Sequence, residues 1–224
     1  MKKILVFAAF VLSTTAMFAQ QEKGTFVVRP MVGLGLSTFG VSEALTLDND
    51  INLYEFETKW KTGFVGGAEV GYQVNKWLQP SIGLFYTQQG SKAEENVKGS
   101  KVSKATLKMD YLTVPVLANF YVWKGLALKI GVQPAFLLSA KGQGYNFKDE
   151  CENFQLQIPF GVSYEYKNFV IDARMNIPCT KTFKKKEASA NARTALVDAV
   201  YDVVIPDARN NMFQFTLGYN FALN

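Results

Sequence analysis

Six charged residues of this 224-residue chain share one side of segments that alternate between apolar and polar residues. Three are basic and three are acidic, so they could line a path for ions or form a neutral, ion-paired cluster. If these segments are strands that close into a barrel of eight, its interior is barely wide enough for side chains. We therefore favour a hydrogen-bonded, ion-paired plug over a pore. The six residues are Arg29, Glu69, Lys129, Glu165, Asp172 and Arg174.

The chain contains no histidine. It therefore lacks the usual general base and the commonest metal ligand of proteins. A Ser-His pair, which can hydrolyse lipids, cannot be assembled. Gly33 and Gly35 resemble part of a dinucleotide loop, but no helix follows them. The sequence thus predicts a protein without enzyme activity, metal or cofactor.

Cys151 and Cys179 are the chain's two cysteines. They flank two segments that form a predicted hairpin around Lys167-Asn168, and they lie within a few residues of direct opposition. In an exported protein such a pair can oxidise. We predict a disulfide that clamps two external loops. Two free thiols or a pair of metal ligands are the alternatives, which the absence of histidine makes less favourable.

The first residues have the layout of a secretory signal peptide. Lys2 and Lys3 precede the apolar run Ile4–Leu12, and small residues lead to Ala19. The run is too short to cross a bilayer as a helix, and no polar stripe marks it as a buried helix. We expect residues 1–19 to be removed. Residues 20–224 would then form one domain with 22 basic and 19 acidic residues, a mild excess that does not indicate nucleic-acid binding.

Beyond the leader, eight segments alternate with a period of two, as strands with two different faces do. No run of 18 apolar residues occurs, which excludes a helical membrane protein. The segments exceed the usual 5 to 6 residues of soluble strands and suit tilted strands that cross a bilayer. Their approximate ranges are 25–37, 61–74, 78–89, 107–122, 126–139, 153–166, 169–178 and 211–224.

The connections alternate between short and long, which is typical of transmembrane barrels with tight periplasmic turns and longer external loops. This pattern also puts both chain ends on the periplasmic side. Ten strands would result if Ile51–Thr58 and part of 193–205 added another pair. The segment Arg193–Ile205 could instead form a short helix or a hairpin extension. The long connections are 38–60, 90–106, 140–152 and 179–210.

One face of every segment is apolar, and the other is rich in glycine, glutamine, serine and threonine. A surface washed by water should carry more charge, whereas a narrow barrel interior suits these residues. A sheet in lipid must also close, because an open edge leaves backbone groups unpaired. Trp77, Trp123 and Tyr166 lie at the short turns, where they could form a periplasmic aromatic girdle. We predict an all-β, closed antiparallel up-and-down transmembrane barrel. A soluble ligand-binding barrel is the alternative, and it would need its apolar rows to face inward.

Several motifs, in order, resemble the PorT-like outer-membrane β-barrel family of Gram-negative bacteria over residues 25–224. The family often has glutamate where this chain has Thr113, so a role tied to that acidic residue does not carry over. The resemblance implies an outer-membrane location but no single activity. The motifs are Gly71-Tyr72, Gly83-Leu84-Phe85-Tyr86 leading to Gly90, Tyr111-Leu112-Thr113-Val114-Pro115, Gly131-Val132-Gln133-Pro134 with Leu138-Ser139-Ala140-Lys141, Ile171-Asp172-Ala173-Arg174, and Gly218-Tyr219.

Two roles fit this barrel. The first is a non-catalytic protein that stabilises the envelope or presents loops to a surface partner. The second is a component of a secretion or transport assembly, because PorT itself is linked to protein secretion.

Lysines gather in two of the long connections. Lys184, Lys185 and Lys186 lie in the last, and Lys92, Lys98, Lys101 and Lys104 lie in the second. Clustered lysines gain energy beside anionic groups, which makes contact with lipopolysaccharide phosphates one interpretation. An ordinary solvated loop is the simpler interpretation, and we favour it.

Overall fold

The computed structural model describes residues 22–40, 55–97, 100–142, 145–183 and 209–223. The predicted signal peptide and the segment Arg193–Ile205 lie outside these residues, so both remain predictions. Among the described residues, no helix has the length and apolar character needed to cross a membrane.

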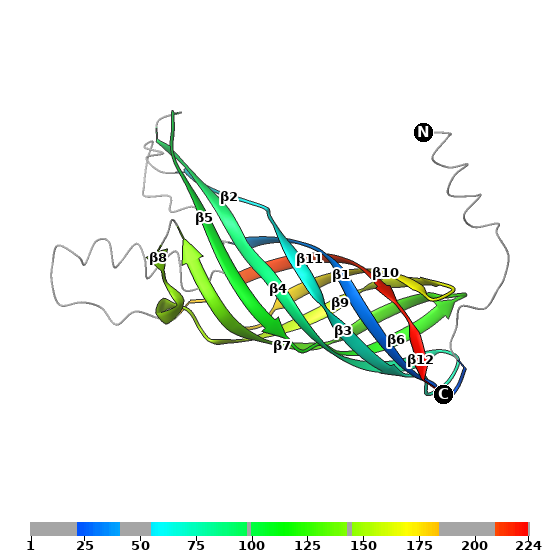
Figure 1. Ribbon diagram of the computed structural model, residues 1–224. Coiled ribbons are helices and arrows are strands. Elements are labelled where there is room, and N and C mark those ends of the chain that lie inside the picture. Colours follow the sequence, from blue (N-terminus) through cyan, green and yellow to red (C-terminus); the bar gives the residue numbers. More distant parts are fainter. Residues whose placement is uncertain (1–21, 41–54, 98–99, 143–144, 184–208, 224) are drawn as a thin grey trace, which may run out of the picture.

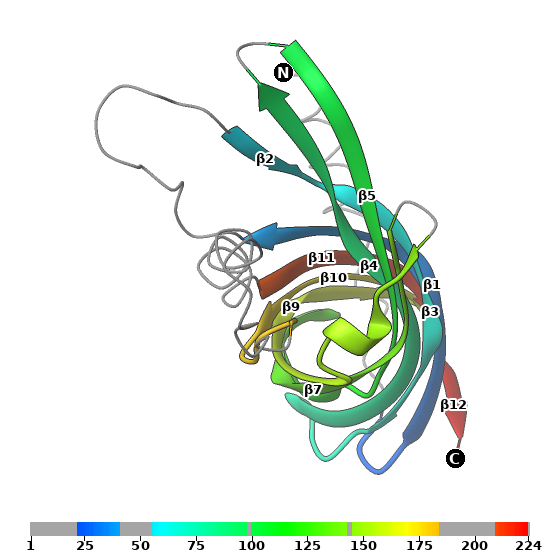
Figure 2. The same ribbon diagram turned by 90° about the vertical axis from the view of Figure 1, so that its left-hand side faces the viewer.

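The described strands form one antiparallel sheet that closes on itself (Figures 1 and 2). The first strand pairs with β3 on one side and with the last two strands on the other, so the wall has no open edge at this seam. The strands are β1 (Phe26–Gly40), β2 (Glu55–Lys59), β3 (Lys61–Tyr72), β4 (Leu78–Val97), β5 (Ser100–Thr113), β6 (Val116–Trp123), β7 (Leu126–Gly142), β8 (Tyr145–Asn146), β9 (Phe154–Tyr166), β10 (Phe169–Pro178), β11 (Arg209–Tyr219) and β12 (Phe221–Leu223).

The closed wall has eight strands, which confirms the predicted fold. β5 and β6 are two parts of one wall strand, interrupted at Val114-Pro115, and β11 and β12 are two parts of another, interrupted at Asn220. β2 does not add a wall strand. It precedes β3 in the chain, is separated from it by Trp60, and pairs with the same neighbour, β4, farther from the short turns. Ten strands had been considered if Ile51–Thr58 and part of 193–205 formed an extra pair. The first of these segments contributes β2, which extends the sheet without adding to the wall, and the second lies outside the described residues.

The structure corrects the prediction of a long loop at 90–106. β4 runs to Val97 and β5 begins at Ser100, so the two strands continue as a hairpin far beyond the barrel rim. β2 pairs with the far part of β4, which makes a three-stranded outgrowth at the end opposite the short turns (Figures 1 and 2).

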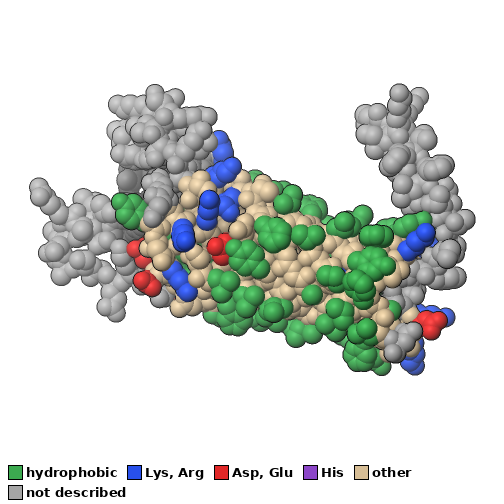
Figure 3. All heavy atoms as spheres, viewed as in Figure 1, with side chains coloured by type: hydrophobic (Ala, Val, Ile, Leu, Met, Phe, Trp, Pro, Cys, Tyr) green, Lys and Arg blue, Asp and Glu red, His purple; other side chains and the backbone are tan. Residues whose placement is uncertain are grey.

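The outer wall of the barrel carries an apolar belt (Figure 3). Valine, leucine, isoleucine and phenylalanine side chains from successive strands are exposed there, among them Leu84, Ile130, Ile171 and Phe215. The opposite faces of the same strands are buried and hold most of the glutamines and charged residues of the wall. An exterior of this kind is stable only against hydrocarbon, because a soluble protein rarely exposes a continuous apolar surface of this extent. The apolar rows point outward, which a soluble ligand-binding barrel would not allow.

Exposed aromatic side chains mark the periplasmic end of the belt. Trp77, Trp123 and Tyr166 are all about half exposed at or beside the short turns. The Trp77 ring stacks on Phe120 with 6.2 Å between ring centroids. The three residues thus lie where a girdle at the membrane interface would need them.

Prolines interrupt the hydrogen-bond ladders of six wall strands. Each lacks the N–H that its neighbour's carbonyl would accept. At one seam the Gly83 amide donates to the Pro115 carbonyl at 2.8 Å, and at the next the Val114 amide donates to the Pro134 carbonyl at 2.9 Å, but neither proline can return the bond. Prolines inside sheets are usually confined to edges, and a closed wall has none. The six are Pro30, Pro80, Pro115, Pro134, Pro159 and Pro178.

Candidate functional site

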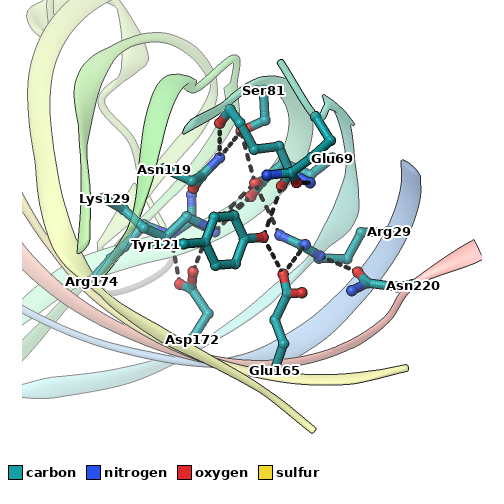
Figure 4. Close-up of polar contacts among 12 residues, drawn as sticks. Arg29, Glu69, Ser81, Asn119, Tyr121, Lys129, Glu165, Asp172, Arg174 and Asn220 are labelled. Carbon is teal, nitrogen blue, oxygen red and sulfur yellow. Dashed lines mark hydrogen bonds and ion pairs between the residues drawn. The ribbon is translucent and has the colours of Figure 1, made fainter. Parts of the chain in front are cut away.

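The alternation of each strand turns all six predicted charged residues into the barrel, where each is at most 3 % exposed. Arg29 on β1 lies directly opposite Glu69 on β3 in the register. Lys129 comes from β7, Glu165 from β9, and Asp172 and Arg174 from β10. Figure 4 shows these side chains converging from different sides of the wall. The structure therefore brings together residues up to 145 positions apart in the sequence, from Arg29 to Arg174.

Glu69 is the centre of this cluster. Its carboxylate lies 3.2 Å from Lys129 Nζ, 3.2 Å from Arg174 Nη2 and 3.7 Å from Arg29 Nη1. The Ser81 hydroxyl donates a further hydrogen bond to it at 3.0 Å. A buried carboxylate loses its hydration, and three cations around one acid restore that stabilisation.

Asp172 forms ion pairs with two of these three cations, Lys129 and Arg174. Its Oδ2 lies 2.7 Å from Lys129 Nζ, and its Oδ1 accepts from Arg174 Nε at 2.7 Å. Arg174 also stacks over the Phe85 ring, with its guanidinium carbon 5.5 Å from the ring centroid. The arginine is thus held by two acids and by an aromatic face.

Glu165 pairs with Arg29 nearer the periplasmic end. The Arg29 Nη2 donates to Glu165 Oε1 at 2.5 Å, and its Nε donates to Asn220 Oδ1 at 2.5 Å. The Tyr121 hydroxyl donates to the same Glu165 oxygen at 2.7 Å. Because Asn220 lies between β11 and β12, these bonds cross the seam where the barrel closes.

Three basic and three acidic groups give this charge network a formal charge of zero. Its polar partners bring in the remaining wall strands, since Ser81 lies on β4, Asn119 and Tyr121 on β6, and Asn220 beside β12. Every strand of the eight-stranded wall therefore contributes a side chain to one connected set of ion pairs and hydrogen bonds. Such a set can fix strand register and block the lumen.

The sequence analysis did not identify four polar residues of the charge network, which are Ser81, Asn119, Tyr121 and Asn220. All four occupy inward positions of their strands and are buried. The alternation alone could have indicated this for each. Their mutual contacts depend on the register between distant strands, which the alternation does not specify.

Apolar side chains fill the lumen on the extracellular side of the charge network. Met31, Val65, Phe85 and Met212 form one buried cluster next to Arg174. A second cluster nearer the extracellular end contains Met109, Tyr111, Ala135, Leu137, Ala140 and Cys151. The interior is thus occupied along its length, as expected for a narrow barrel. Within the described part of the chain, no group of three metal-binding side chains is positioned to hold an ion.

The structure corrects the predicted disulfide. Cys151 forms a bridge pair with Phe183, whereas the Cys179 amide donates to the Leu156 carbonyl at 2.8 Å. The cysteines are therefore out of register by four positions, about 13 Å of extended chain. A disulfide tolerates only about 4.4–6.8 Å between Cα atoms. Cys151 is buried with its thiol 3.5 Å from the Phe147 carbonyl, and Cys179 is exposed. The sequence had placed the two cysteines close enough to pair, but the four-position difference in register keeps them apart.

We expect the two thiols to differ in reactivity. In the folded, unreduced protein, a maleimide should label Cys179 rapidly and Cys151 only after unfolding, because Cys151 has no exposed surface. Mass spectrometry of labelled peptides measures this directly, with Cys179→Ser as the control that should remove the fast reaction. A peptide pair linked by a disulfide would contradict the structure.

The predicted lysine sites are only partly within the described residues. Lys184, Lys185, Lys186 and Lys98 lie outside them. Lys101 and Lys104 lie on β5 in the outgrowth, and Lys92 is exposed on β4 near its base. Contact of the 184–186 lysines with lipopolysaccharide therefore stays a prediction.

Comparison with known proteins places the chain beside outer-membrane barrels. A family model described as outer membrane protein beta-barrel domain matches residues 18–184. Among solved structures, the attachment invasion locus protein Ail of Yersinia pestis is 14 % identical, with 89 % of this chain and 100 % of that chain covered and a TM-score of 0.41. OprG of Pseudomonas aeruginosa is 10 % identical, with 91 % and 99 % covered and a TM-score of 0.45. Neisserial surface protein A is 14 % identical, with 88 % and 97 % covered and a TM-score of 0.45. No curated protein matches this chain.

Proposed function

Because the chain belongs to the outer membrane protein beta-barrel domain family, we propose that it is a non-catalytic outer-membrane protein that seals its own lumen and presents a rigid sheet at the cell surface. Its location in the outer membrane follows from the family and the fold. The observation that carries the proposal is the charge network, which spans the lumen with zero formal charge and contacts from every wall strand. A protein that conducted ions would need part of this charge to be accessible to water.

Planar-bilayer recording tests the sealed lumen. We expect the unmodified protein to give no large steady current, because paired side chains and the two apolar clusters fill the barrel. Arg174→Ala should also give none, since Phe85 and its apolar neighbours still close the lumen above the vacated position. A steady current in the unmodified protein would overturn the proposal, and a current only in the variant would show that Arg174 is the seal.

The surface role rests on the outgrowth of β2, β4 and β5. Residues 100–106 of β5 pair with β4 on one side, and among the described strands β7 joins β5 only from Leu107. β2 likewise pairs with β4 alone in the described sheet. Such strands offer backbone groups to which another protein can add a strand.

This exposed sheet also supports the second candidate, a component of a PorT-type secretion assembly. Membership of an assembly requires partners in fixed stoichiometry, whereas a structural barrel does not. Affinity purification from detergent-solubilised outer membranes distinguishes the two. Partners recovered in fixed ratio, and lost when the hairpin 93–104 is replaced by a short turn, would favour the assembly. Recovery of the barrel alone would favour the structural role.

A further inference from the structure

Three exposed lysines lie side by side on the outer wall at the extracellular end of the barrel. They are Lys92 on β4, Lys108 on β5 and Lys141 on β7. The register places Lys108 directly opposite Lys141, and Lys92 opposite Thr106, two residues from Lys108. Figure 3 shows basic side chains gathered here, beside the apolar belt. We call these residues the wall lysines.

Among the described residues, no ion pair involves any of the three wall lysines. Asp110 lies two residues from Lys108 on the same side of β5, opposite Gln88 and Ser139, and Glu94 lies two residues beyond Lys92 on β4, so neither acid stands directly opposite a wall lysine. Like charges directly opposite each other destabilise a strand pair. The wall therefore keeps an unfavourable pair, Lys108 with Lys141, that an external anion would convert into a favourable one.

The apolar belt begins immediately below these lysines. Leu138 and Phe136 are exposed on β7, and Leu112 on β5 lies opposite Phe136. Lys141 lies three positions after Leu138 on β7, which is about 10 Å along the strand. The same strip of wall thus offers cations at the interface and hydrocarbon contacts directly beneath, the arrangement that an anionic amphiphile fits.

We propose that the wall lysines bind the phosphate groups of a phosphorylated outer-leaflet lipid, whose acyl chains lie against Leu112, Phe136 and Leu138. The position of the lysines at the long-loop end puts them in the outer leaflet, and the belt continuous with them selects a lipid over a soluble anion. The site is made of residues on β4, β5 and β7 and does not include the lysines at 184–186. It goes beyond the sealed surface barrel proposed above, which needs no bound lipid.

Native mass spectrometry of the protein released from detergent micelles tests this site. The probe is diphosphorylated lipid A, and the same lipid without its phosphates is the comparison. A lysine at an anionic interface contributes about fivefold in affinity, so Lys92→Gln with Lys108→Gln and Lys141→Gln should weaken lipid A binding roughly a hundredfold. The triple variant should fold, because it removes the repulsion between Lys108 and Lys141. Heat-modified migration on a gel verifies this independently.

The matched control removes three lysines at the other end of the barrel. Lys23, Lys124 and Lys167 are exposed near the periplasmic turns, and their replacement by glutamine changes the net charge equally. This control should bind lipid A as the unmodified protein does. Equal loss in both variants would show attraction to net charge alone and overturn the site. Unchanged binding in the wall-lysine variant would also overturn it. Displacement of lipid A by inorganic phosphate at millimolar concentration would show an anion site without lipid specificity, which contradicts the role of the belt.

Discussion

Glu69→Gln is expected to lower the free energy of unfolding of the barrel by about 3–5 kcal/mol, the cost of leaving buried charge without its partner. Glu69 faces Arg29, Lys129 and Arg174 at once. Its loss would leave three cations against Glu165 and Asp172 in a lumen closed to water. Denaturant unfolding of the protein in lipid vesicles, followed by tryptophan fluorescence, measures the change. Glu152→Gln at an exposed position is the control and should have little effect.

A double variant separates lost charge balance from lost packing. Lys129→Met in the Glu69→Gln background restores two cations against two acids, and methionine keeps most of the lysine's volume. We expect it to recover part of the stability, so that the two substitutions are strongly non-additive. Additive losses, or a Glu69→Gln variant as stable as the unmodified protein, would show that the network does not hold the barrel through its charge balance.

Val132→Arg is expected to cost about 2–4 kcal/mol, the cost of a cation on the lipid face at the bilayer midplane. Val132 is exposed on β7 midway along the belt between Leu126 and Leu138. Hydrocarbon cannot solvate a guanidinium there, and the side chain is too far from either interface to reach water easily. Unfolding in vesicles and the yield of folded protein report the effect.

The control for this variant is the same substitution at the end of the belt. Leu138→Arg lies near the wall lysines and should cost only about 0–1 kcal/mol, because the depth dependence falls toward the interface. Equal costs at positions 132 and 138 would mean that the belt does not lie in hydrocarbon. A larger cost at 138 would place the bilayer at a different height on the wall.

The sequence predicted the barrel wall because the alternation of apolar and polar residues within each strand shows which side chains face lipid and which face the lumen. Along Phe64–Tyr72 every second residue faces lipid, and Glu69 among the others had to face inward. The contacts of Glu69 were beyond the alternation, because they depend on how far each strand slides along the next. The same missing register made Cys151 and Cys179 look paired when they are four positions out of line.

The outgrowth escaped prediction for a different reason. The expected strand ended at Gln89, and a strand that only crosses a bilayer needs about 9 to 11 residues. Outside the membrane, strand length is set by pairing rather than by hydrocarbon thickness. β4 continues past Gly90, which has a φ of 136° and marks a bend that most residues would resist. The predicted loop 90–106 began at this position, which lies within a longer strand.

The six wall prolines affect the chain before it reaches its membrane. An unfolded copy in an aqueous compartment exposes eight apolar segments, each long enough to stack with other copies into fibrils. Six wall strands carry a proline, and in such a stack every copy would lack the same amide hydrogen. Intermolecular stacking would repeat that defect at every layer, whereas the closed barrel contains it once per strand. The prolines therefore disfavour the stacking of unfolded copies more than they disfavour folding of a single copy into the barrel.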